Sequence, residues 1–277
     1  MASDTTELLA ELKQADYVRY TATLFAPEDK RPALATLYLF QADIERIRDL
    51  ISEPLPGEIR LQWWRDVFMG MRDGEAQQSP LASALLATID ANGLARERFT
   101  AYLDAMEFDL YDDPMPSKAD FEGFMGETQS VFIQMTAQVL NGSVLPSGDA
   151  GGHAGVAYGV MRCLTHLDKH RARGQIYVPR DMLEGCSIEP KIWLASGDVA
   201  AKSEVIRQFA QFGADHVAKA REAMTAIPSA SRAAFLAISV CDSVFGRAKK
   251  VPEAFLTNHG GLSRLRVQWS MFKAALR

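Results

Sequence analysis

Residues 162–179 read RCLTHLDKHRARGQIYVP, and the interpretation of the whole sequence depends on this stretch. An α-helix over its first half places His166 and His170 on one face, because residues four positions apart lie one turn above each other. Arg162 lies one turn before this pair, and Arg171 and Arg173 follow it. The pattern is compatible with a metal site, an anion-binding site or the remnant of an older site.

The composition is that of a folded globular protein. The chain has 277 residues, of which 48% are hydrophobic and 23% are charged, enough for one large core or two smaller ones. A formal net charge of -5 argues against a general nucleic-acid-binding protein, which needs a basic surface. Cys163, Cys186 and Cys241 are widely spaced and odd in number, which argues against a disulfide framework and fits a reducing compartment.

Two features of the sequence bear on cellular location. Residues 1–16 carry acids and lack a long apolar core, unlike a secretory signal or a basic transit peptide. No apolar run approaches the roughly 18 residues that a membrane-spanning helix needs. We therefore expect a cytoplasmic protein whose contact with a membrane, for example the inner membrane, is peripheral at most.

Apolar residues recur at steps of three and four along nearly the whole chain, which predicts helices throughout. These helices are expected over residues 3–12, 26–52, 54–74, 79–93, 95–113, 117–142, 201–228 and 229–250, besides the one that carries His166 and His170. The glycine-rich residues 146–155 are predicted to form a loop, and residues 175–190 an extended or irregular connection. No repeat or linker divides the chain, so the prediction is one all-α domain over residues 1–277.

Four stretches of the sequence resemble the squalene and phytoene synthase family. They are ALATLYLFQADIERIRDL (33–50), QWWRDVF (62–68), AYLDAMEFDLYDD (101–113) and GVAYGVMRCLTHLDKHRARGQIYVP (155–179), and the similarity spans roughly residues 20–250. Its most specific part is Gly174, Tyr177 and Pro179. The resemblance implies a single all-α isoprenoid-synthase-like helical bundle with a central cavity. There, two facing aspartate-rich helices would hold magnesium ions that bind two prenyl diphosphates.

The first aspartate-rich motif of that family is altered in this chain. The three positions at which the resemblance places aspartates hold Glu45, Arg46 and Asp49, so one acid has become a cation. Because magnesium prefers oxygen ligands, a cation at this place weakens the expected metal cluster.

The second motif departs further. Counting back from Gly174, the two expected aspartates correspond to His166 and His170, the expected glutamine to Gly159 and the expected asparagine to Arg162. Neutral imidazole is a poor magnesium ligand, and a protonated imidazole repels the metal. Ordinary magnesium-assisted prenyl condensation is therefore not expected.

Three interpretations of these positions remain open. The ligand-binding candidates are Glu45, Arg46, Asp49, Arg162, His166, His170 and Arg173. Two histidines and a carboxylate can bind zinc or iron, whereas the arginines with one or both histidines can hold a phosphate group without a metal. A remnant without ligand, in which polar contacts inside a bundle satisfy these side chains, is the third interpretation.

Other chemistry-bearing residues have simpler explanations. Trp63 and Trp64 are adjacent in sequence, so we expect one in the core and the other at its edge. Asp109, Asp112 and Asp113 are more typical of a charged helix end than of a cation site. Cys163 has two interpretations: a thiol nucleophile activated by the nearby His166, or an ordinary buried cysteine. No catalytic residue is assigned.

Residues 50–64, LISEPLPGEIRLQWW, are more similar to one branch of the family that has lost the aspartate motifs and includes complex I assembly factors. This resemblance implies a non-catalytic protein without a cofactor, whose partners are subunits or assembly intermediates of the NADH:quinone oxidoreductase. The alternative is a divergent prenyl-diphosphate transferase of the squalene/phytoene synthase type, which would still need magnesium. A protein that binds an isoprenoid or lipid diphosphate without turnover is a further alternative.

The C-terminal stretch GGLSRLRVQWSMFKAALR predicts a basic amphipathic helix. Its apolar stripe is Leu262, Leu265, Trp269, Phe272 and Leu276, and its basic residues are Arg264, Arg266, Lys273 and Arg277. Most such stripes pack on a core, and packing on the bundle is the first expectation. The alternative is contact with anionic lipid or a partner helix, in which case a chain cut after Asn258 stays folded but binds anionic liposomes or its partner complex less well.

Overall fold

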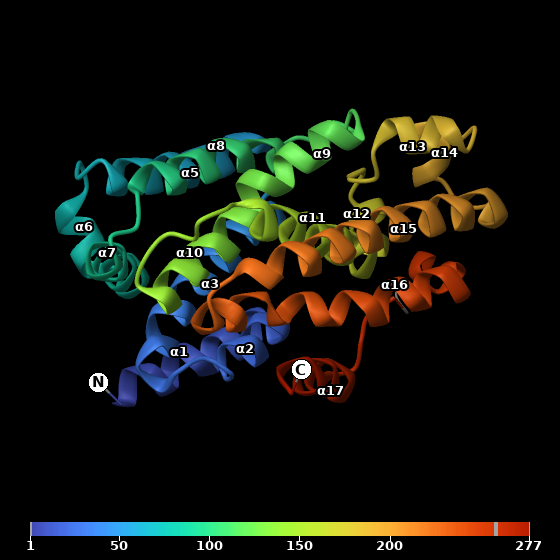
Figure 1. Cartoon of the computed structure of the whole chain (residues 1–277). Helices are drawn as coiled ribbons and strands as arrows, with labels where there is room; N and C mark the ends of the chain where they lie inside the picture. The colour runs from blue at the N-terminus through green and yellow to red at the C-terminus, as the bar shows by residue number, and fades with distance from the viewer. Residues whose placement is uncertain (1, 258–259, 277) are drawn as a thin grey trace. The chain divides into compact units, whose positions relative to one another are not determined.

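The computed structural model describes residues 2–257 and 260–276, and this part of the chain forms helices and turns without any strand (Figure 1). The all-α prediction is therefore confirmed. None of the helices in these ranges is both long and apolar enough to cross a membrane.

The chain forms two compact units, each assembled from three segments. The first unit comprises Met1–Tyr111, Val131–Pro146 and Pro228–Ala234. Its helices are α1 (Ala2–Ala15), α2 (Tyr17–Thr23), η1 (Glu28–Lys30), α3 (Arg31–Glu45), α4 (Ile47–Leu50), α5 (Pro54–Phe68), α6 (Asp73–Gln78), α7 (Pro80–Asn92), α8 (Arg96–Met106), η2 (Glu107–Leu110) and α10 (Val131–Asn141).

The second unit comprises Asp112–Ser130, Ser147–Ile227 and Phe235–Arg277. Its helices are α9 (Lys118–Met125), η3 (Gly126–Ser130), α11 (Asp149–Thr165), α12 (Leu167–Ala172), α13 (Arg180–Gly185), α14 (Pro190–Leu194), α15 (Val199–Ala223), η4 (Met224–Ala226), α16 (Cys241–Lys250), η6 (Pro252–Leu256) and α17 (Arg264–Ala275). The 3-10 helix η5 (Ser229–Val240) contributes residues to both units. That the whole chain is one domain stays a prediction.

Aromatic side chains form the core of the first unit around the fully buried Phe40 of α3. The rings around it belong to Trp64, Phe68, Phe99, Tyr102 and Phe132. Trp64 is nearest, with its ring centre 4.8 Å from that of Phe40 in an edge-to-face arrangement. The neighbouring Trp63 is half-buried and donates its indole N–H to Glu75 over 2.8 Å. The expected division of the two tryptophans between core and edge is thus confirmed.

The predicted helix over residues 26–52 is interrupted in the structure. A 3-10 turn precedes α3, α3 ends at Glu45, and Arg46 separates it from the short α4. The helical region stops at Leu50 because Ile51 and Glu53 have extended backbones, with ψ near 150°. Glu53 precedes a proline, whose ring disfavours helical backbone at the residue before it.

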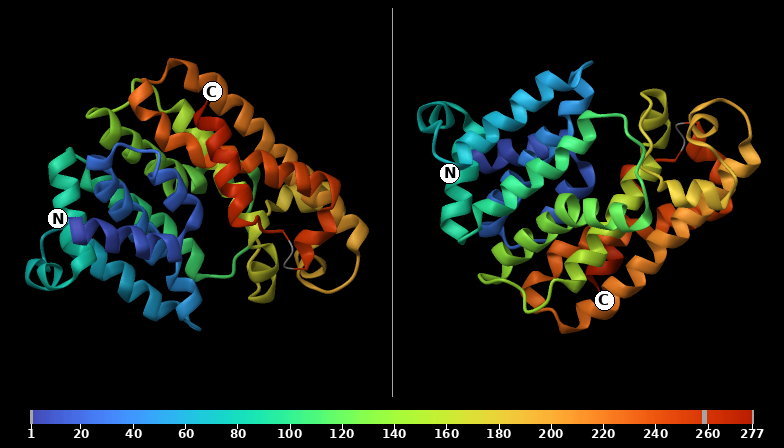
Figure 2. Two further views of the ribbon diagram at one scale, coloured as in Figure 1. Left: turned by 90° about the horizontal axis from the view of Figure 1, so that it is seen from below. Right: turned by 90° about the horizontal axis from the view of Figure 1, so that it is seen from above.

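In the second unit, α15 lies alongside α11 and α16 (Figure 2). The predicted loop over residues 146–155 is wrong, because α11 already begins at Asp149. Glycine here permits close helix packing. A Cβ atom on Gly155 would lie 2.1 Å from Ser130 Oγ and within 2.5 Å of the Ser130 backbone. Composition alone suggested a turn, whereas the close contact with Ser130 requires a residue without a side chain at position 155.

Ser130 closes a π-helical turn that the sequence did not predict. The helix expected over residues 117–142 is instead α9, the π turn η3 and α10. The Ser130 hydroxyl lies 3.0 Å from the backbone oxygen of Gly152 and 3.2 Å from that of Met125. A π turn widens a helix by one residue, and here it brings Ser130 against α11.

Candidate functional site

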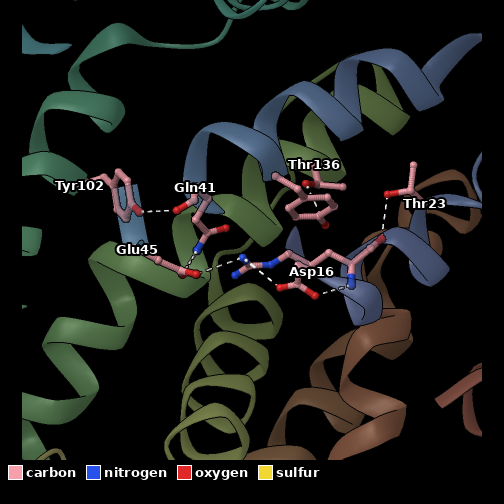
Figure 3. A network of polar contacts seen from close by, with 8 residues as sticks. Asp16, Thr23, Gln41, Glu45, Tyr102 and Thr136 are labelled. Carbon is pink, nitrogen blue, oxygen red and sulfur yellow. Dashed lines mark hydrogen bonds and ion pairs between the residues drawn. The ribbon is translucent and has the colours of Figure 1, made fainter. Parts of the chain in front are cut away.

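The first half of the candidate site lies at the C-terminal end of α3, where Glu45 binds a buried arginine. Arg19 of α2 has a side chain only 4% exposed, and its Nη1 lies 3.6 Å from Glu45 Oε2 and 3.5 Å from Asp16 Oδ2 (Figure 3). The other oxygen of Glu45 accepts a hydrogen bond from Gln41 Nε2 over 3.1 Å. The charge of Glu45 is therefore balanced by a guanidinium inside the protein.

Neighbouring side chains hold this ion pair in place. The Tyr102 hydroxyl donates to the backbone oxygen of Gln41 over 3.3 Å, and the Arg19 guanidinium lies 5.4 Å from the centre of the Tyr38 ring. Thr136 donates to the Tyr38 hydroxyl over 3.2 Å (Figure 3). Burial raises the pKa of the Tyr38 phenol above its usual value, so the ring stays neutral beside the cation.

Arg46 and Asp49 lie outside this arrangement. Arg46 caps α3 where the helix breaks, and its backbone oxygen accepts from the Asp49 N–H over 3.0 Å. Both side chains are exposed. Of the three predicted first-motif residues, Glu45 alone belongs to the buried network described here.

The second half of the candidate site lies where α11 gives way to α12. The expected continuous helix breaks at His166, which caps the end of α11 and precedes α12. The His166 Nδ1–H donates to the backbone oxygen of Arg162 over 2.9 Å. The rings of His166 and His170 still lie on one side, with their centres 6.1 Å apart. The predicted pairing of the two histidines is thus found, although the helix between them is not continuous.

His170 is the more enclosed of the two histidines. Its ring meets Tyr177 edge to face, with centres 4.6 Å apart, and its Nδ1 is buried without a hydrogen-bond partner. Burial, together with the positive charges of Arg162, Lys169 and Arg173 and the neighbouring His166, holds the pKa of His170 well below its usual value. The imidazole is therefore neutral at physiological pH.

The arginines around these histidines have different partners. Arg162 and Arg173 are half-buried, and Arg173 donates from Nε to the Gln175 side chain. Arg171 points to the end of α14 instead, where it donates to the backbone oxygens of Trp193 and Ala195 over 2.8 Å each. The sequence placed Arg171 next to the predicted site, whereas the structure uses it to satisfy the free carbonyl groups of a helix end.

Gly174 turns the chain after α12. It has a left-handed backbone with φ of 85°, which favours glycine. The extended segment that follows is held by Met115, whose N–H donates to Ile176 and whose oxygen accepts from Arg180, both over 2.9 Å. The irregular connection predicted over residues 175–190 is confirmed up to Pro179. It is wrong for the next six residues, because the short helix α13 begins at Arg180 and ends at Gly185.

Met125 occupies the space next to Gly159. A Cβ atom built on Gly159 would lie 2.1 Å from the sulfur of Met125, whose side chain is buried. In the family resemblance, position 159 carries a glutamine of the second motif. The sulfur of Met125 fills the space that the first atoms of a glutamine side chain at position 159 would need.

The donor atoms of these residues do not fit magnesium. The carboxylate of Glu45 is already paired with Arg19, and the second motif offers imidazoles among cations. Over the described residues, no group of three or more His, Cys, Asp or Glu side chains could hold a metal ion. Glu45 belongs to the first unit and His170 to the second, and the predicted facing of the two motifs stays a prediction.

Two polar clusters were missed from the sequence. Arg19 lies in YVRYTATLF, which has no motif around it, so its pairing with Glu45 could not be read from spacing. In the second unit, His216 of α15 lies 3.0 Å from both Glu122 Oε1 and His153 Nδ1. His153 falls in the stretch predicted as a loop, and the helix found there directs its ring towards α15.

Comparison with known proteins identifies the family. The model of the squalene/phytoene synthase family matches residues 12–273. The NADH dehydrogenase (ubiquinone) complex I assembly factor 6 of Mus musculus is 24% identical over 225 residues, covering 81% of this chain and 68% of the relative. The human protein is 26% identical over 227 residues with the same coverage. A presqualene diphosphate synthase of Sinorhizobium fredii is 27% identical over 164 residues, covering 58% of each chain.

Solved structures agree on the fold. A dehydrosqualene synthase superposes with a TM-score of 0.76 at 14% identity, covering 98% of this chain and 95% of the other. A squalene synthase of Alicyclobacillus acidocaldarius superposes with a TM-score of 0.72 at 17% identity, covering 90% of this chain and 94% of the other. The family match over residues 12–273 and this shared fold lead to one conclusion: the chain belongs to the squalene/phytoene synthase family.

Proposed function

We propose that this protein is a non-catalytic member of its family that acts as an assembly factor for respiratory complex I. The observation that carries the proposal is the ion pair between Glu45 and Arg19, because a protein cation pairs with a carboxylate that the family resemblance assigns to metal binding. The match to relatives named complex I assembly factor 6, over 81% of this chain and 68% of each relative, supports the same function. The proposed partners are subunits or assembly intermediates of complex I, met at the cytoplasmic side of the inner membrane.

The decisive experiment removes the gene in its own host and measures complex I by native gel electrophoresis and NADH:quinone oxidoreductase activity. Loss of the assembled complex, restored by the wild-type chain, is the expected result. A variant carrying Asp49→Asn, His166→Gln and His170→Gln should restore assembly equally well, because the proposal gives these positions no catalytic task. A normal amount of active complex I in the deletion strain contradicts the proposal.

A second function is favoured by two observations, the similarity to presqualene diphosphate synthases and the arginines around His170. It is a divergent prenyl-diphosphate transferase, or a protein that binds an isoprenoid diphosphate without turnover. We expect no diphosphate release from farnesyl or geranylgeranyl diphosphate with magnesium. Steady release that Glu45→Ala abolishes would favour the enzyme over the assembly factor.

Binding without turnover has its own test. If Arg162 and Arg173 hold a diphosphate, Arg162→Ala and Arg173→Ala should each weaken farnesyl diphosphate binding by roughly 1.5–3 kcal/mol, the scale of a hydrogen bond to a charged group. Calorimetric titration without magnesium measures this directly. Equal affinity in wild type and both variants would leave the motif positions as a remnant without a ligand.

A further inference from the structure

Helix α17 is attached to the second unit by one face only. Val267, Ser270 and Met271 are buried, and the Ser270 hydroxyl lies 3.3 Å from that of Ser243 on α16. Just before α17, the backbone oxygen of Gly261 accepts a hydrogen bond from Arg247 over 3.0 Å. These contacts fix which side of α17 faces the protein, and Figure 2 shows α17 lying over α16 in the left-hand view.

The opposite face of α17 carries large apolar side chains. Leu265 is 77% exposed, Trp269 59%, Phe272 49% and Leu276 73%. Their steps of four, three and four residues form one stripe, half a helical turn away from the buried face. The first expectation from the sequence, that this stripe packs on the bundle, is therefore wrong. Val267 and Met271 make the contact, because they lie on the side facing α16.

Basic side chains border this exposed stripe. Arg266 and Lys273, two turns apart, lie along one edge and Arg264 along the other, by the geometry of the helix. The Lys273 ammonium lies 5.8 Å from the ring centre of Trp269, which is stacked at 6.1 Å on Phe272. Residues 260–276 contain no acid, although the whole chain has a net charge of -5. The net charge of residues 260–276 is thus opposite in sign to that of the whole chain.

We infer that α17 is a docking helix for a membrane surface that contains anionic lipid. Leucine, phenylalanine and tryptophan side chains insert at the boundary of headgroups and acyl chains, and lysine and arginine bind lipid phosphates from the same helix. The helix has 12 residues and is about 18 Å long, so it lies in the plane of the membrane and does not cross it. The complementary charge selects anionic lipid over a neutral surface.

The inference goes beyond the proposed function and is tested separately, by sedimentation of the full chain with vesicles. Vesicles of phosphatidylglycerol and phosphatidylcholine should bind the wild type at least tenfold more strongly than pure phosphatidylcholine vesicles do, and 0.5 M salt should weaken the binding. Trp269→Ser with Phe272→Ser, and separately Arg266→Gln with Lys273→Gln, should each lower the partition coefficient about tenfold. All four side chains are exposed, so the urea unfolding midpoint should stay unchanged.

The matched control is Leu55→Ser with Ile59→Ser. These two side chains are 63% and 62% exposed on α5, and their loss should leave vesicle binding as it is. Brominated lipid should quench the fluorescence of the wild type more than that of Trp269→Phe, which places Trp269 in the bilayer surface.

Equal binding by the wild type and the two α17 double variants overturns the inference, as does equal binding to neutral vesicles. A third outcome also overturns the inference: the wild type associates with itself but does not bind vesicles, and Trp269→Ser with Phe272→Ser abolishes the self-association. The stripe would then bind a second copy of the chain. None of these outcomes depends on whether deletion of the gene impairs complex I, so the two proposals fail or stand separately.

Discussion

Arg19 determines what Glu45 can do. A carboxylate that is 12% exposed needs a nearby cation or hydrogen bonds, and Glu45 has a cation in Arg19 and a hydrogen bond from Gln41. A magnesium ion at this carboxylate would lie next to a guanidinium that is itself buried, and the two cations would repel each other. In the polar network of Figure 3, Glu45 thus has its partners within the protein.

Removal of the buried cation is the first test of this description. Arg19→Met keeps the volume of the side chain but leaves Asp16 and Glu45 without their shared partner. We expect the free energy of unfolding at pH 7 to fall by about 3–5 kcal/mol, the usual effect of breaking a buried ion pair. Urea denaturation measures this loss. The control Arg180→Met breaks an exposed pair with Glu184 and should have almost no effect. Equal, small changes in both variants would contradict a structural role for Arg19.

His170 makes a prediction about pH. Its folded pKa lies below the unfolded value near 6.5, so between these two values the unfolded chain binds a proton that the folded chain does not. Stability is therefore full above pH 7 and is lost as the pH falls through 6.5, by at most about 1.4 kcal/mol per pH unit for this residue. Unfolding free energies at pH 8, 6.5 and 5.5 should fall less steeply in His170→Gln than in the wild type. A parallel decline in the two proteins would contradict a buried neutral His170.

At the scale of secondary-structure elements, the glycines of α11 decide how closely its neighbours approach. Gly155 meets the backbone of Ser130 in the π turn, Gly159 meets the side chain of Met125, and Gly152 has no atom near its missing Cβ. The three positions share one helix but differ in what surrounds them. Substitution of these glycines by alanine should therefore change the free energy of unfolding by amounts that differ in sign as well as in size.

Alanine at these three positions forms a graded series. Gly155→Ala should destabilise the protein most, by about 3 kcal/mol, because the Ser130 backbone cannot move away from the added methyl group. Gly159→Ala should cost only about 1–2 kcal/mol, because the flexible Met125 side chain can shift. Gly152→Ala should stabilise by about 0.5–1 kcal/mol, the usual difference between the two residues in a helix. Thermal and urea unfolding measure all three. In a double-mutant cycle, Gly159→Ala should cost less stability in a Met125→Ala background than in the wild type, and an equal cost in both backgrounds would contradict the assigned contact.

The sequence predicted elements well where local signals are strong and poorly where packing decides. Ser79 and Gly93 bound α7 as expected, since Ser79 accepts from the Ala82 N–H and Gly93 adopts a left-handed backbone. The π turn at Ser130 and the early start of α11 depend on contacts between distant segments, which no local pattern reveals. The candidate site shows the same division between local signals and packing. The altered motif positions could be found by counting, but Arg19 and Met125, which occupy the space around them, could not.

For the whole molecule, connectivity suggests how the two units unfold. Each unit is built from three segments that alternate along the chain with those of the other. Neither unit can therefore be cut out as one continuous piece, and we expect a single cooperative transition. Urea unfolding followed by tryptophan fluorescence and by circular dichroism should give coincident curves. Arg19→Met in the first unit and Gly155→Ala in the second should shift the same transition. Two separated transitions would contradict the prediction of one domain over residues 1–277.

The sulfur of Met125 beside Gly159 makes the residue type at 159 depend on the residue type at 125. Aspartates introduced at positions 166 and 170 change the charge of the second motif but create no room for a side chain at 159. Gly159→Gln introduced first collides with the thioether, and a smaller residue introduced first at 125 leaves a cavity in the core. Either order passes through a less stable intermediate. A glutamine at position 159 is therefore accommodated only when residue 125 changes with it.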